Sequence, residues 1–482
     1  MATAELVAVT RTPSALELTF ADTPDALLMI ASDQSAAVQS GQAEFRDNRL
    51  VADLSAGPGE MVFDDGTRLA WTTTADAPKT VPEQQVPGSE SGATAVVLSR
   101  FAAEAAELFA GSPATVHAEA PPLEALGVYA GRGRYRATVP AGCAQVLIHG
   151  AADILSLSIR PAAGEPLPLG TLTPFGAAAV VDLPAGNGGE FSADVEIWGH
   201  SNFDDARLPA LSLGALRGTG TVMAVVRTTD VSSLWRVHGG GQWAEPGRAL
   251  RGFGGWSSSR LGVGIGYRKT LSAPAEEENY LHFAGLTSPI SVCVGSLAPA
   301  VVVPENPYLR LPRETIGWDI DVTFPHDPSH GPGPVTLLSG VLLQDWSVQA
   351  LPQEGLDAMA QAAGVAAVPA EGPAGLPREV PAGSACWLSP DLADLESGRG
   401  YFLKASGSGL MISAWLDGVR LGRVMPGVQG DSAAPRMSGG DPGVIWLPAP
   451  MMKPQARLTL LLESRGTSAG RLESLLCERA HS

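Results

Sequence analysis

The chain has 482 residues and a formal net charge of −18, from 50 acidic and 32 basic residues. A surface this acidic repels phosphate backbones and anionic lipids, so nucleic acid and membrane surfaces are not expected as partners. Glycine (56 residues) and proline (39 residues) are abundant without a collagen-like period, which indicates many short strands joined by turns.

The N-terminal region predicts a small β-sandwich over residues 1–78. Short, often alternating segments such as LVAVTRT, ALELTFA and RLAWTTT are separated by Pro, Asp, Gly and Ser. The sequence DDG at 64–66 is a hairpin signal between two of them. No signal-peptide pattern and no apolar run of membrane-spanning length is visible, so we expect a cytoplasmic protein.

Two segments predict helices. Residues 79–115 predict a polar linker followed by a helix, because Ser99 can cap RFAAEAAELFAG and Gly111 can end it. The segment EGLDAMAQAAGVAA, near 354–367, predicts the second helix. A (β/α)₈ barrel or a doubly wound sheet needs a helix after almost every strand, so two helices in 482 residues argue against both folds.

The rest of the chain predicts further sandwiches of the jelly-roll kind. Short strands and Gly/Pro-rich loops indicate one jelly roll at 116–232, a second at 233–345, and a C-terminal jelly-roll portion at 346–482 with a Pro/Gly-rich loop at 367–383. The expected fold class is therefore all-β, with several β-sandwich or jelly-roll domains in series and few helices. The cysteines lie far apart without CxxC spacing and predict free thiols at Cys143, Cys293, Cys386 and Cys477.

Two segments near the C-terminus resemble a known family. LMISAWLDGVRLGRV (410–424) and GVIWLPAPMMKPQARLTLLLES (443–464) follow each other as do two phrases in the C-terminal jelly-roll (galactose-binding-like) domain of family 35 β-galactosidases. Asp417 replaces the family's Asn, and both suit the turn before Gly418. Val424 and Met425 replace a Tyr-Trp pair, which removes an aromatic contact. The matching residues are Trp415, Gly418, Leu421, Gly422, Arg423, Pro448, Met452, Lys453 and Glu463.

The family's catalytic part has no counterpart in this sequence. Retaining hydrolysis needs two carboxyl groups about 5–5.5 Å apart, and the family supplies them from an N-terminal barrel. The nearest string here, EEENYL (276–281), precedes an apolar strand and indicates a solvated acidic loop. The resemblance therefore implies a non-catalytic carbohydrate-binding or accessory subunit. Such a subunit docks on a separately encoded TIM-barrel glycoside hydrolase subunit, helps to shape its sugar site and needs no cofactor.

Two other functions stay open. The chain could be a glycoside hydrolase active on its own, because spacing in the sequence does not exclude two carboxylates that meet on a sandwich. It could also be a structural assembly protein that uses its sandwiches as adhesive modules. Loops at the ends of sandwiches are the usual positions of binding sites, so candidate binding residues are expected in the loops.

Two loops combine aromatic and hydrogen-bonding side chains, as sugar sites do. The first is WGHSNFDDAR (198–207), with an internally bonded loop or a Ca²⁺ site as alternatives. The second is the Gly-rich segment 236–260, where core packing of the aromatic side chains is the alternative. FPHDPSH (324–330) has two prolines and indicates a turn, so no metal site is expected. The candidate carbohydrate-binding residues are Trp198, His200, Asn202, Asp204, Asp205, Arg207, Trp243 and Trp256.

Overall fold

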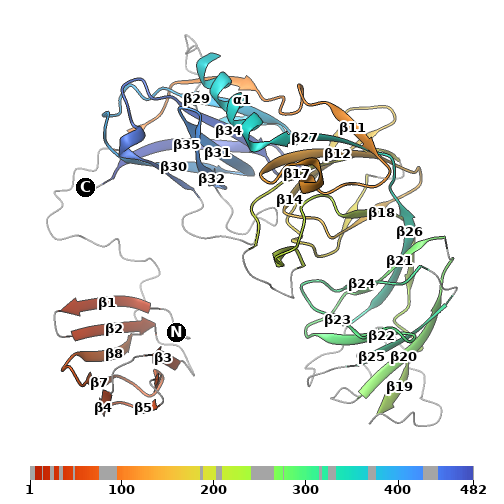
Figure 1. The fold of residues 1–482 in the computed structure, drawn as a ribbon, viewed down its shortest axis with the longest axis horizontal. Helices are drawn as coiled ribbons and strands as arrows, with labels where there is room; N and C mark the ends of the chain where they lie inside the picture. Colours follow the sequence, from red (N-terminus) through yellow and green to blue (C-terminus); the bar gives the residue numbers. More distant parts are fainter. Residues whose placement is uncertain are drawn as a thin grey trace. The chain divides into compact units, whose positions relative to one another are not determined.

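A computed structural model of the chain shows an all-β protein, which confirms the predicted fold class (Figure 1). The chain forms two compact units, Met1–Gly92 and Ala93–Ser482. None of the helices in the described part is long and apolar enough to cross a membrane. The structure describes residues 6–12, 15–21, 27–31, 36–46, 49–74, 95–184, 188–201, 209–239, 265–274, 276–313, 317–323, 333–366, 376–426 and 443–480.

The first unit contains two sheets around one core, here called the N-terminal sandwich. The sheet orders are β1-β2-β8-β7-β4 and β3-β6-β5, and Leu50, Met61 and Trp71 are buried in the core. The predicted hairpin at 64–66 is confirmed, but β2 and β8 pair in parallel. The strands are β1 (Leu6–Thr12), β2 (Ala15–Ala21), β3 (Leu27–Ala31), β4 (Ala36–Ser40), β5 (Ala43–Arg46), β6 (Arg49–Asp53), β7 (Gly59–Phe63) and β8 (Arg68–Thr74).

The central sandwich, in the second unit, has two six-stranded sheets. Their orders are β11-β27-β12-β17-β14-β15 and β16-β13-β18-β26-β21-β24, and Tyr135, Phe191 and Trp346 are buried in the core. The strands that come before the insertion described next are β11 (Ala114–His117), β12 (Gly131–Val139), β13 (Gln145–His149), β14 (Ile154–Pro161), β15 (Leu167–Leu172), β16 (Ala179–Asp182), β17 (Gly189–Glu196) and β18 (Thr221–Asp230).

A smaller sandwich, the inserted sandwich, lies in the chain between β18 and the returning strands β26 and β27. Its sheet, β19-β20-β25-β22-β23, shares a core with residues of β21 and β26, including Phe283 and Val335. The strands of this sheet are β19 (Arg236–Gly239), β20 (Ile265–Ser272), β22 (Ile290–Val294), β23 (Ala300–Val302) and β25 (Gly317–Thr323). The remaining strands of the central sandwich are β21 (Glu278–Phe283), β24 (Tyr308–Arg310), β26 (Val335–Leu342) and β27 (Trp346–Pro352).

This insertion differs from the predicted boundaries at 232/233 and 345/346. Residues 346–352 form β27, which pairs with β11 and β12 of the central sandwich rather than with the C-terminal domain. The alternation of apolar and polar residues identifies a strand but not its partners. A chain that leaves a sandwich and returns to it therefore resembles two separate domains in the sequence.

The C-terminal sandwich has sheet orders β10-β29-β34-β31-β32 and β28-β35-β30-β33, with β9 paired to β35. Ile412, Leu460 and Leu475 are buried between the sheets. Of the loop predicted at 367–383, residues 376–383 are described and include a short strand, β28. The strands are β9 (Val96–Val97), β10 (Phe101–Ala105), β28 (Arg378–Val380), β29 (Ala385–Pro390), β30 (Tyr401–Ser408), β31 (Leu410–Leu416), β32 (Val419–Val424), β33 (Val444–Leu447), β34 (Leu458–Ser464) and β35 (Gly470–Arg479).

The prediction of a helix within residues 79–115 is wrong. Phe101–Ala105 is strand β10, which pairs antiparallel with β29, and Phe101 is buried in the C-terminal core. Ala and Glu favour a helix only weakly, and a ladder of backbone hydrogen bonds along an existing sheet outweighs that preference. The segment therefore supplies edge strands to a sandwich whose other strands lie almost 300 residues later in the chain.

The second predicted helix is confirmed as α1 (Gln353–Ala366), the one α-helix in the part of the chain that the structure describes. Helix α1 lies beside the strands of the C-terminal sandwich (Figure 1). Leu356 and Ala360 belong to the same buried cluster as Trp387 and Trp415. The Trp415 indole N–H donates a hydrogen bond to Asp357 Oδ1 at 2.7 Å. Trp415, one of the residues that match family 35, therefore fixes the helix to the sheet.

The turn between β31 and β32 uses two residues with positive φ. Asp417 has φ 50° and Gly418 has φ 79°, which suits a two-residue hairpin with the right-handed strand twist. The predicted Asp-Gly turn is thus confirmed. The cysteines are free thiols in the structure as predicted, with Cys143, Cys386 and Cys477 buried.

We predict that Gly418→Ala lowers the free energy of unfolding by about 1 kcal/mol, because a Cβ disfavours the left-handed region. Gly422→Ala is the matched control: it lies in the same hairpin, its Cβ would meet no atom within 4 Å, and its φ is not in the left-handed region. Urea unfolding of both variants measures the difference. An equal effect of the two substitutions would contradict the turn assignment.

Candidate functional site at the junction of two sandwiches

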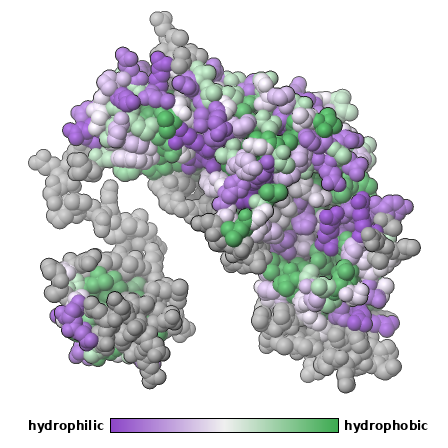
Figure 2. Space-filling model, viewed as in Figure 1, coloured by the Kyte–Doolittle hydropathy of each residue, from purple (hydrophilic) through white to green (hydrophobic). Residues whose placement is uncertain are grey.

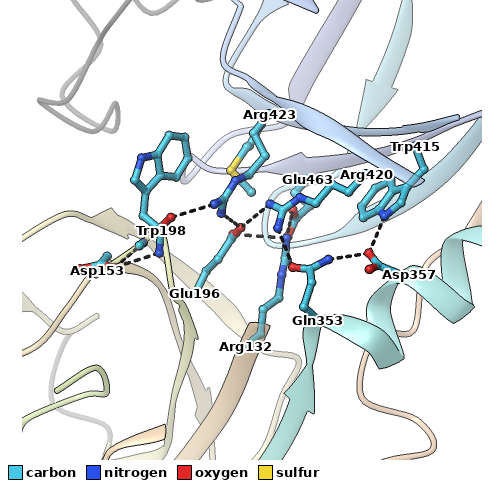
Figure 3. Close-up of polar contacts among 12 residues, drawn as sticks. Arg132, Asp153, Glu196, Trp198, Gln353, Asp357, Trp415, Arg420, Arg423 and Glu463 are labelled. Atoms are coloured by element: carbon cyan, nitrogen blue, oxygen red, sulfur yellow. Dashed lines mark hydrogen bonds and ion pairs between the residues drawn. The ribbon is translucent and has the colours of Figure 1, made fainter. Parts of the chain in front are cut away.

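Six charged residues meet where the central sandwich contacts the C-terminal sandwich (Figure 3). Arg132 of β12 and Glu196 of β17 come from the central sandwich. The other four come from the C-terminal sandwich. We call this group the junction cluster, and its members are Arg132, Glu196, Arg420, Arg423, Glu463 and Arg465.

Glu196 lies at the centre of the junction cluster. Its Oε2 is 2.8 Å from Arg465 Nη2 and 3.2 Å from Arg132 Nη2. Its Oε1 contacts the Arg423 guanidinium and lies 4.0 Å from Arg420 Nη2. The Glu196 side chain is only 4% exposed, so these contacts replace nearly all of its hydration.

Glu463 is held by two of the same arginines. Both terminal nitrogens of Arg132 contact its carboxylate, the second at 2.8 Å, and Arg465 Nη2 lies 3.3 Å away. Arg465 also donates to Ser156 Oγ at 2.7 Å, which connects the C-terminal sandwich to β14. The junction cluster therefore joins the two sandwiches through bidentate and shared ion pairs.

Burial alone would raise the pKa of the Glu196 carboxyl, but Arg132, Arg423, Arg465 and Arg420 lower it to about 2. Burial, followed by the repulsion of Arg423, lowers the pKa of Arg420 to about 10, with Glu196 acting against it. A general acid for glycoside hydrolysis needs a carboxyl whose pKa is raised towards neutrality. Glu196 has the opposite environment, so its role here is to bind arginines.

A ladder of polar side chains continues from the junction cluster along one face of β12, β17 and β14. The β12–β17 register places Arg132 opposite Glu196 and Arg134 opposite Asp194. Arg134 Nε and Nη2 donate to the two Asp194 oxygens at 2.7 and 2.6 Å. The β14 register adds a serine to this face, with Ser156 opposite Asp194. Alternate residues of a strand point to the same face of the sheet, so these polar side chains line up on the face that points away from the core.

Two adjoining hollows, of about 230 and 170 Å³, follow this ladder and form one groove. They share Arg134, Ser156, Asp194 and Gly383 in their linings. The charged residues of the groove are five arginines and five acids, so its charges balance although the whole chain carries −18. They are Arg132, Arg134, Arg136, Arg160, Arg465, Glu107, Glu190, Asp194, Glu196 and Glu463.

The structure describes two of the eight predicted sugar-binding residues. Trp198 is half-buried, and the Arg423 guanidinium lies 4.1 Å from its ring centroid, so one face of the indole is already covered. The His200 side chain is 41% exposed, and its Nε2 lies 2.9 Å from the Tyr129 carbonyl oxygen. The other six lie outside the described residues, namely Asn202, Asp204, Asp205, Arg207, Trp243 and Trp256.

The start of the 198–207 loop is held by a buried ion pair. The Arg217 side chain is 2% exposed, and its Nε lies 2.9 Å from Asp153 Oδ1. Asp153 also accepts the Trp198 backbone N–H at 2.8 Å, and Arg217 donates to the Gly199 carbonyl at 2.8 Å. The start of the loop is therefore held by residues from outside it. Residues 202–207 lie outside the described residues, so the alternative of an internally bonded loop stays a prediction.

Sequence reasoning missed the polar ladder, although its signal is in the chain. In GRGRYR (131–136) arginine recurs at every second residue, and GEFSADVE (189–196) carries its acids with the same period. Two such strands can pair their charges across a sheet. Neither segment contains a feature that identifies the other as its neighbour in the sheet.

A third hollow, of about 370 Å³, lies in the inserted sandwich. Its walls include Val292, Val294 and Leu309, and a patch of hydrophobic surface is visible over β22–β24 (Figure 2). Glu278 is fully buried at this hollow, with Arg310 Nη2 at 2.9 Å and Arg313 Nε at 2.6 Å. The prediction of a solvated acidic loop at 276–281 is therefore wrong for Glu278. Among the described residues, no group of three or more His, Cys, Asp or Glu side chains could hold a metal ion.

Comparisons with known proteins do not identify a family. No family model matches the chain, and no curated protein matches it. The β-D-glucuronidase of Dictyoglomus thermophilum is 9% identical, over 51% of this chain and 43% of that chain, with a TM-score of 0.19. A calcium-binding mutant of Bacteroides uniformis β-glucuronidase 2 is 9% identical, over 49% and 28%, with a TM-score of 0.18.

A family 78 rhamnosidase of Bacillus sp. GL1 is 14% identical, over 77% of this chain and 55% of that chain, with a TM-score of 0.17. This chain thus spans less than half of both glucuronidases and just over half of the rhamnosidase. TM-scores this low carry no argument about fold or function. The likeness to family 35 β-galactosidases stays a hypothesis drawn from the sequence.

We predict that Glu196→Gln lowers the free energy of unfolding by about 3 kcal/mol at pH 7, because it leaves several buried arginines without their carboxylate. The stabilisation from Glu196 exists above its unfolded-state pKa of 4.5 and is lost as pH falls through about 2. The difference between wild type and variant should therefore shrink between pH 4.5 and pH 2. Chemical denaturation across this range measures it.

Glu473→Gln is the control, because Glu473 pairs with Arg471 at 2.6 Å but its side chain is 50% exposed. Exposed pairs contribute little, so this variant should change stability by less than about 1 kcal/mol at every pH. A Glu196→Gln protein as stable as this control would contradict the proposed role of the junction cluster.

Proposed function

We propose that this chain is a non-catalytic carbohydrate-binding or accessory subunit of a β-galactosidase-like glycoside hydrolase, and that it acts in the cytoplasm. The observation that supports this most is the charge-balanced groove on the central sandwich. Guanidinium, carboxylate and hydroxyl groups are the planar and rotatable partners that sugar hydroxyls use. A groove with equal numbers of arginines and acids suits a neutral ligand better than an anion or a cation.

The free thiols support the proposed compartment. All four cysteines lack a disulfide partner, and three of them are buried. Disulfides are usual in oxidising compartments and rare in the cytosol. A set of unpaired buried cysteines therefore fits a reducing compartment.

We propose that the separately encoded catalytic barrel docks on the hydrophobic patch of the inserted sandwich. Leu297 is 56% exposed and Val301 is 69% exposed, beside the 370 Å³ hollow. Exposed apolar residues that gather beside a hollow mark interaction surfaces. An accessory subunit needs such a surface in addition to its sugar groove.

The alternative of a hydrolase active on its own is weaker at this site. The environment of Glu196 keeps it ionised, and Glu463 is shared between two arginines. A retaining or inverting pair needs one carboxyl that can give up a proton at the working pH. The third candidate, a structural assembly protein, gains no support from the junction cluster, because its ion pairs join two sandwiches of the same chain.

We predict that Asp194→Asn weakens binding of a neutral galacto-oligosaccharide about tenfold, because it breaks the bidentate pair that positions Arg134 in the groove. Isothermal titration calorimetry on the purified chain measures the dissociation constant. Asp321→Asn is the matched control, since Arg268 and Asp321 form a similar pair at 2.7 Å in the inserted sandwich. Equal affinities for both variants and wild type would place saccharide binding outside the groove.

We predict that the chain alone does not hydrolyse aryl-galactosides and that a barrel subunit encoded beside it acquires or increases activity when the two are mixed. Leu297→Asp combined with Val301→Asp should abolish that increase, because charge in the patch opposes docking. Val116→Asp is the control, because Val116 is 75% exposed on β11 of the central sandwich. Turnover by the lone chain would overturn the accessory role and favour the self-sufficient hydrolase.

A further inference from the structure

The outer face of the C-terminal sandwich carries an exposed aromatic pair. Phe402 of β30 and Trp446 of β33 are direct cross-strand partners. They are 41% and 43% exposed, with ring centroids 4.9 Å apart and ring planes inclined by 48°. Their neighbours Leu403 and Ile445 are buried in the core, as strand alternation requires. The pair is therefore on the outer face of the sheet.

Gly400 holds the indole in place. A Cβ at this position would come within 2.4 Å of a Trp446 ring carbon, so the ring packs against the backbone of Gly400. Any side chain at 400 would displace the ring. Large aromatic side chains are usually buried, and one that is fixed by a glycine while still 43% exposed is positioned for contact with another molecule.

One ion pair adjoins the aromatic pair on the same sheet. Glu478 is the cross-strand partner of Phe402 on β35, and Lys404 Nζ lies 2.7 Å from its carboxylate. Hydrogen-bond donors and acceptors of both signs thus lie next to exposed ring surface.

We propose that Phe402 and Trp446 form a second saccharide-binding site, separate from the junction groove, that takes a neutral pyranose within a soluble glycan chain. The proposal rests on the proposed carbohydrate-binding role but on different residues. A pyranose presents C–H groups on one face, which stack on an aromatic ring, and hydroxyls at its edge, which reach groups such as Lys404 and Glu478.

A protein partner fits this face less well. The centres of protein interfaces are depleted in Lys and Glu, whereas an ion pair adjoins this aromatic pair directly. The inclination of the rings selects among saccharides. Two planes 48° apart cannot both lie on a flat surface, so the site suits a soluble chain that twists between sugar units rather than an insoluble, flat polysaccharide.

The test compares variants that keep apolar volume but remove the ring. Trp446→Leu and Phe402→Leu should each weaken binding of a soluble neutral oligosaccharide at least about fivefold, the size of one aromatic stacking contact. Trp446→Phe should retain most of the affinity. Val97→Ala, at a residue 60% exposed on β9 of the same sheet, is the control and should bind as wild type. Thermal unfolding verifies that each variant is folded.

Asp194→Asn in the groove separates this inference from the proposed function. If the leucine variants lose affinity and Asp194→Asn does not, the aromatic site stands and the groove assignment fails. If only Asp194→Asn loses affinity, the aromatic site is refuted and the groove stands. A wild type that binds no soluble saccharide refutes both. Retention of wild type on insoluble crystalline cellulose, with no affinity for soluble chains, refutes the selection made by the inclined rings.

Discussion

The burial of Glu196 among arginines from two sandwiches is the interaction on which the candidate site depends. A carboxylate 4% exposed would be costly to bury without partners. Arg132 comes from the same sheet, but Arg423 and Arg465 come from the C-terminal sandwich, more than 200 residues away in the chain. Glu196 is therefore satisfied only when the two sandwiches meet in one arrangement.

The arrangement of the two sandwiches that satisfies Glu196 also determines which residues line the groove. One wall is the polar ladder of the central sandwich, and Glu463 and Arg465 of the C-terminal sandwich also line the larger hollow. Buried ion pairs often contribute more to a unique arrangement than to net stability, because their desolvation offsets much of the attraction. Here we infer that the junction cluster fixes the relative position of the two walls, and that fixed position is what a binding groove needs.

The arginines around Glu196 favour a binding role for it over a catalytic one. The arginines that make burial of Glu196 tolerable also lower its pKa to about 2, so the carboxyl carries no proton to donate near neutral pH. Further along the ladder, Arg134 and Asp194 are paired with each other and carry no net charge together. A face built in this way offers many hydrogen bonds to a neutral molecule, and Glu196 does not act as a general acid there near neutral pH.

Local patterns were sufficient for some parts of the structure and insufficient for others. The Asp417–Gly418 turn, helix α1 and the all-β class follow from residues close together in the chain. β10 was predicted as a helix because its Ala and Glu residues favour one, while its strand state depends on pairing with β29. The inserted sandwich and the junction cluster depend on the same kind of distant pairing. Half of the polar ladder is visible in each of two segments, but only their register brings the halves together.

If both proposed saccharide sites exist, the groove, the aromatic pair and the junction cluster act together in binding one ligand. Single sugar sites bind weakly, because a few hydrogen bonds and one stacked ring must offset the lost hydration and freedom of the ligand. Two weak sites on one rigid body hold a long glycan much more tightly, since the second contact is intramolecular, provided that the ligand can span both. The groove lies where the central sandwich meets the C-terminal one, and the aromatic pair lies on the outer face of the C-terminal sandwich. The junction cluster joins these two sandwiches. Loosening the junction would lower the effective concentration of the second site, and it would also alter the groove, because four residues of the junction cluster line the larger hollow. Under this proposal the buried arginines act in binding by keeping two distant surfaces in register.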